Sequence, residues 1–66
     1  MNEIRARKIT QILQDNGWSV VAVADKNWDG SPLWGVKFLA TDVVYYTTSS
    51  MPQSWQDQVQ STRERS

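Results

Sequence analysis

The sequence contains no cysteine and no histidine. Without cysteine there are no disulfide bonds and no thiolate metal sites, and without histidine the chain lacks the side chain that most often transfers protons near neutral pH. Serine and threonine are plentiful but have no histidine base to activate them. The glycines at positions 17, 30 and 35 are too scattered to form a phosphate-binding loop. We therefore expect a protein that is not an enzyme and that uses no cofactor.

The sequence also lacks an excess of either charge and any long apolar run. Seven basic and seven acidic residues give a formal net charge of zero, so no long-range attraction to nucleic acid or to an anionic membrane is expected. No segment approaches the roughly 18 apolar residues that a membrane helix requires. The first residues lack the apolar stretch of a signal peptide. These features together predict a cytoplasmic location.

Aromatic residues, in contrast, are abundant. The 66 residues include four tryptophans, two tyrosines and one phenylalanine. A chain of this length buries roughly 60% of the surface that its unfolded form exposes, so its stability is marginal unless its core is dense or a partner chain contributes. We expect a single domain over residues 1–66, with a polar tail that frays from about Thr62.

Both ends of the sequence predict helices. Residues 2–16 have helical apolar periodicity, with Asn2 as a plausible N-cap. Gly17 is free to adopt a positive φ and predicts a Schellman ending for this helix. Ser50 is predicted to cap the second helix, and Gln53 would complete its capping box.

The middle of the chain predicts three antiparallel strands. They are the short segments rich in β-branched and aromatic residues, at 18–24, 33–40 and 43–48. Turns are expected at 27–30 and at 41–42, although the second has no Gly or Asn to supply the positive φ that tight hairpins favour. The predicted fold is a small α+β domain of order α-β-β-β-α, with a three-stranded antiparallel sheet flanked by two helices.

This order of elements is similar to that of the double-stranded-RNA-binding domain. In that family the last helix contacts the RNA backbone through a cluster of lysines, which residues 54–65 of this sequence lack. The resemblance therefore implies a shared topology, and nucleic-acid binding is kept as an alternative function. The basic residues available for it are Arg5, Lys8, Lys26 and Lys37.

Each predicted strand carries apolar residues at both its odd and its even positions, so neither face of the sheet is polar. With the two turns as predicted, one face holds Val21, Val23, Trp34, Val36, Phe38, Val43 and Tyr45. The other face holds Trp18, Val20, Leu33, Leu39, Val44 and Tyr46, interrupted by Lys37. Either one helix covers each face, or both helices cover the same face and another chain covers the second. The apolar stripe of the second helix has only three large residues, Met51, Trp55 and Val59, which favours the second arrangement.

The loop between the first two strands contains two candidate sites. Asp25, Asn27 and Asp29 fit the first half of a calcium-binding loop, but the twelfth position, which should be a bidentate glutamate, is Val36. They are weak candidate metal ligands, because hairpin turns have the same composition. Trp28 lies at a polar hairpin tip with few core neighbours, and tryptophan is enriched among residues that dominate interface energies.

These observations predict a non-catalytic protein–protein interaction module. It would be a small regulatory protein, an adaptor or an inhibitor, of the kind found among phage accessory proteins, and it would bind a protein partner or form a homodimer. The predicted partner-binding residues are Trp28, Trp18, Leu39, Val44 and Tyr46.

Overall fold

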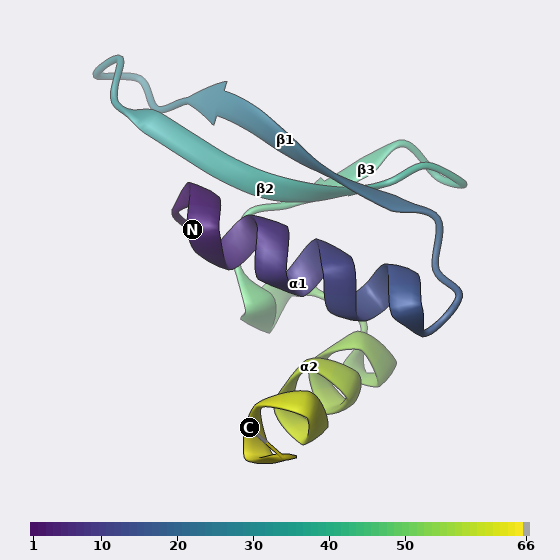
Figure 1. The fold of residues 1–66 in the computed structure, drawn as a ribbon. Coiled ribbons are helices and arrows are strands. Elements are labelled where there is room, and N and C mark those ends of the chain that lie inside the picture. The colour runs from purple at the N-terminus through teal and green to yellow at the C-terminus, as the bar shows by residue number, and fades with distance from the viewer. Residues whose placement is uncertain (66) are drawn as a thin grey trace.

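A computed structural model describes the backbone of residues 1–65 and the side chains of residues 1–62. The elements in chain order are α1 (Glu3–Asp15), β1 (Val20–Lys26), β2 (Pro32–Phe38), β3 (Val43–Tyr45), the short 3-10 helix η1 (Thr48–Ser50) and α2 (Gln53–Arg65) (Figure 1). The strands form one antiparallel sheet in the order β1-β2-β3. The predicted α+β fold is therefore confirmed.

Local signals in the sequence define both ends of α1. The Asn2 side chain accepts a hydrogen bond from the backbone N–H of Arg5 at 2.8 Å, which satisfies one free donor of the first turn. At the other end Gly17 has a φ of 93°. The backbone N–H of Trp18 then donates to the carbonyl of Leu13 at 3.0 Å, as in a Schellman motif. The predicted N-cap and helix ending are both confirmed.

The hairpin between β1 and β2 is one residue longer than predicted. The strands pair Lys26 with Pro32, so the loop contains residues 27–31. Ser31 belongs to the loop because its backbone carbonyl accepts a bond from Asn27 and its hydroxyl donates to Asp29. The extra residue shifts the pairing by one position and exchanges the two faces of β1.

The predicted faces are therefore wrong for β1. Val20 pairs with Phe38 and lies on the side of the sheet that faces the helices. Val21 and Val23, which were expected beside Val36, lie on the opposite side, because neighbouring residues of a strand point to opposite faces.

The other predicted boundaries change for identifiable reasons. Asp42 adopts a φ of 63° and supplies the positive φ that the second turn was expected to lack. The second helix begins at Gln53 rather than Ser50. Ser50 does not cap it, because its hydroxyl donates to the carbonyl of Thr47 within the segment of η1. The tail predicted to fray from about Thr62 falls on the last turn of α2 and on position 66, which lies outside the described residues.

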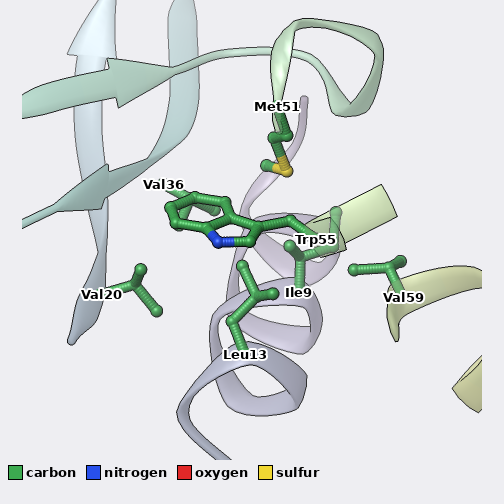
Figure 2. Packing of buried hydrophobic residues seen from close by; sticks show 7 residues of the cluster. All are labelled: Ile9, Leu13, Val20, Val36, Met51, Trp55 and Val59. Carbon is green, nitrogen blue, oxygen red and sulfur yellow. The ribbon is translucent and has the colours of Figure 1, made fainter. Parts of the chain in front are cut away.

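Trp55 of α2 lies at the centre of the hydrophobic core (Figure 2). It is fully buried, and its ring centroid lies 5.1 Å from that of Phe38 and 5.2 Å from that of Tyr45. A third ring, that of Trp18, lies at 5.6 Å. Aromatic pairs at these separations each contribute about 0.5–1.5 kcal/mol beyond the burial of their surface. The other buried members of this core are Ile9, Leu13, Val20, Val36, Met51 and Val59.

Trp55→Ala is expected to lower the free energy of unfolding by about 3–5 kcal/mol, because it opens a cavity that borders both helices and the sheet. Such a loss is comparable with the total stability of a small domain. The matched control is Trp28→Ala, the same change at a side chain that is 98% exposed. For the control, urea denaturation should show a loss of free energy of unfolding of no more than about a few tenths of a kcal/mol. Equal losses in the two variants would contradict the packing described.

Candidate functional site

Within residues 1–65, one face of the sheet carries no helix. Both helices lie on the other side of the sheet (Figure 1), where Trp55 of α2 and Leu13 of α1 share a core with Val20 and Val36. This result confirms the arrangement in which both helices cover the same face. We call the opposite side the open face. The strand pairing puts Val21, Val23, Asp25, Leu33, Gly35, Lys37 and Val44 on it, and Tyr46, which follows β3, lies over Gly35. Leu39, directly after β2, continues the same alternation.

Tyr46 crosses the open face from β3 towards β1. Its ring passes over Gly35 of β2 so closely that a Cβ atom on Gly35 would lie 2.9 Å from the Tyr46 Cδ1 atom. The Tyr46 hydroxyl then donates a 2.8 Å hydrogen bond to the Asp25 carboxylate. Glycine is thus needed in the central strand because an aromatic ring occupies the place of its side chain.

Two polar interactions lie beside the aliphatic residues of the open face. The ammonium of Lys37 lies 2.7 Å from the carboxylate of Asp42. The Asp25 carboxylate accepts bonds from the N–H of Lys26 and from Tyr46. The pKa of Asp25 is lowered, first by the Lys26 N–H and second by the Tyr46 hydroxyl. The pKa of Tyr46 is raised by the same bond, because the neutral phenol is the form that donates.

The hairpin of residues 27–31 presents Trp28 on an ordered loop. The loop closes through bonds between the backbone atoms of Asn27 and Ser31 and between their side chains, each at 2.9 Å. Asp29 accepts from both the N–H and the hydroxyl of Ser31, and these bonds lower its pKa. Gly30 completes the turn with a φ of 85°. The Trp28 side chain is 98% exposed, so this loop projects a large aromatic group into solvent.

Two of the five predicted partner-binding residues, Val44 and Tyr46, lie on the open face. Leu39, in the turn that follows β2, is 52% exposed at the edge of this face. Trp28 lies in the hairpin at the end of the same sheet. Trp18 does not belong to the site, because its ring packs against Phe38 and Trp55 and its indole N–H donates to Gln58 at 2.9 Å.

Sequence reasoning missed Val21, Val23 and Gly35 as members of the site. The first two were assigned to the wrong face by the one-residue error in hairpin length. The role of Gly35 depends on Tyr46, which is far away in the sequence, so no local pattern indicates it.

The weak calcium site predicted in the hairpin has no support from its geometry. The carboxylates of Asp25 and Asp29 both accept hydrogen bonds from neighbouring residues, and the Asn27 amide donates to Ser31. Among the described residues no group of three or more acidic, histidine or cysteine side chains is placed to hold a metal ion. Neither α1 nor the described length of α2 is long and apolar enough to cross a membrane.

The four basic residues considered for nucleic-acid binding lie on three different elements, α1, β1 and β2. Arg5 and Lys8 are on α1, Lys26 ends β1, and Lys37 is paired with Asp42 on the open face. They do not form the continuous basic surface that a phosphate backbone requires.

Comparisons with protein-family models, with curated proteins and with solved structures find no match to this chain. Its function is therefore inferred from the residues of the open face and the hairpin.

Gly35→Ala is expected to destabilise the fold by about 1–3 kcal/mol, as overpacking does elsewhere. The new Cβ would lie 2.9 Å from the backbone oxygen of Tyr45 as well as from the Tyr46 ring, so β3 has to move. Urea denaturation gives the free energy, and NMR shows whether the Tyr46 resonances shift. An alanine variant as stable as the parent protein would mean that Tyr46 does not cover this strand.

Tyr46→Phe is expected to raise the pKa of Asp25 while leaving it below its usual value, because the Lys26 N–H still donates. A carboxylate whose pKa is lowered by folding stabilises the folded state at pH values above its unfolded pKa. This contribution is lost as the pH falls through the folded pKa. Between about pH 5 and about pH 2 the variant should therefore lose less stability than the parent protein. NMR titration of the Asp25 carboxyl and denaturation at the two pH values test this; unchanged titration would exclude the bond.

Proposed function

We propose that this chain is a non-catalytic protein-binding module, of the regulatory, adaptor or inhibitor type. It docks on a partner protein through the open face and the Trp28 hairpin. The observation that carries the proposal is the position of both helices on one side of the sheet. Within residues 1–65 no helix covers Val21, Val23, Leu33 and Val44, which are half-buried. Apolar surfaces of this kind usually mark interaction sites.

The size of the open face indicates what kind of partner it suits. Two strands of seven residues and one of three give a face on the order of 300 Å². Two copies packed face to face would bury roughly 600 Å² in total, which is below the ~1,200 Å² of the smallest stable interfaces. A homodimer through this face alone is therefore disfavoured. A larger partner that also contacts the hairpin and the Leu39 turn reaches the required area.

Trp28 has the properties of an anchor for such a partner. Its loop is held by hydrogen bonds within residues 27–31, so little conformational entropy is lost when it binds. A fully exposed tryptophan contributes nothing to the core of the domain, and burial of tryptophan in a partner's pocket is among the strongest contributions found at interfaces.

Trp28→Ala is expected to weaken binding to the partner by about 2 kcal/mol, or roughly 30-fold in Kd, without lowering the melting temperature. The partner is found by placing a photo-crosslinking amino acid at position 28 or position 39 and irradiating in an extract of the source cells. The matched control carries the same group at Gln60, an exposed position on α2.

The proposal predicts the same crosslinked protein from positions 28 and 39 and none from position 60. Crosslinks from all three positions alike, or from none, would contradict it. Crosslinks between two copies of the chain at positions 28 and 39 would instead show a homodimer.

A further inference from the structure

A second apolar surface lies on the helical side of the molecule, away from the open face. Residues 2–12, at the start of α1, and Val59 and Thr62 of α2 line a groove of about 690 Å³. Ile9 and Val59 are almost fully buried at its base. Ile12 is half-buried beside them, and Ile4 is 69% exposed on its wall. Ile4 is a large aliphatic residue that the core does not use.

The charged residues that line the described part of this groove are all basic. They are Arg5 and Lys8, and none of the other lining residues among positions 1–62 is acidic. The nearest acidic residue of α1 in sequence, Glu3, is paired with Arg7 at 2.8 Å. Within residues 1–62 neither Arg5 nor Lys8 forms an ion pair. Within the side chains that the structure describes, the groove therefore combines an apolar base with two basic residues that form no ion pair.

We propose that this groove binds an amphipathic α-helix of a partner protein that carries acidic side chains beside its apolar stripe. A helix fits because a third helix can pack its ridges into the space between two others. An extended peptide would instead leave its backbone N–H and C=O groups unpaired against apolar side chains. From Ile4 to Ile12 the groove runs about 12 Å along α1, so it spans roughly two turns of a bound helix.

Such a helix presents apolar residues at i, i+3 or i+4, and i+7 to the isoleucines of the groove. Acidic residues at its flanks lie within reach of Arg5 and Lys8 and give the complex its orientation. This site does not share residues with the open face, so it stands independently of the function proposed above.

The test uses two fluorescein-labelled model peptides of about 15 residues, each with leucines at the helical spacing. One carries glutamates beside the leucines and the other carries lysines at the same positions. Fluorescence anisotropy with the full chain is expected to show at least about tenfold tighter binding of the glutamate peptide. The preference should shrink as salt is added. Equal affinity for the two peptides, or no saturable binding of the glutamate peptide, would overturn the proposal.

Variants of the chain locate the site. Lys8→Glu should remove most of the preference between the peptides, because the new carboxylate offsets the charge of Arg5, whereas Lys26→Glu, the same change in charge at the end of β1, should leave it unaltered. Ile4→Ser changes an exposed position, so circular dichroism should show an intact fold. The Kd of the glutamate peptide should rise at least about fivefold. Trp28→Ala should have no effect, which separates this site from the open face. Equal effects of Lys8→Glu and Lys26→Glu would show non-specific attraction and refute the groove.

Discussion

The indole of Trp55, on α2, packs against α1 and against the sheet at the same time. The rings of Trp18, Phe38 and Tyr45 pack around it. A domain of this length has enough apolar residues for one hydrophobic core. Both helices contribute to this core on the same side of the sheet. Because both helices are used in this way, the part of the chain that the structure describes has no helix for the other side of the sheet.

Side chains of the sheet and its turns partly cover the open face. Tyr46 lies over Gly35 and bonds to Asp25, so that a single side chain extends from β3 to β1. Lys37 and Asp42 form an ion pair at the same surface. These contacts order the face without removing its apolar character, which is the state expected of a preformed binding surface. The hairpin that carries Trp28 is ordered in the same way, by bonds among Asn27, Asp29 and Ser31.

Most of the fold could be predicted because its signals are local. Asn2 and Gly17 define the first helix by their intrinsic preferences, and the three strands follow from β-branched and aromatic composition. The pairing register could not be predicted, since it depends on whether Ser31 joins the loop or the strand, and that is decided by hydrogen bonds to Asn27 and Asp29. The same uncertainty moved Val21 and Val23 to the wrong face. Val44 and Tyr46 do not depend on this register, and both lie on the face opposite the helices, where the sequence pattern had put them beside Leu33.

The open face exists because Val21 and Val23 point away from the helices while Val20 faces Trp55. Nuclear Overhauser effects between valine methyl groups and aromatic rings measure this arrangement in the free protein. We expect contacts from the Val20 and Val36 methyls to the Trp55 indole, and none from Val21 or Val23. Contacts from Val21 and Val23 to Trp55 would show the other register and would contradict the open face as described.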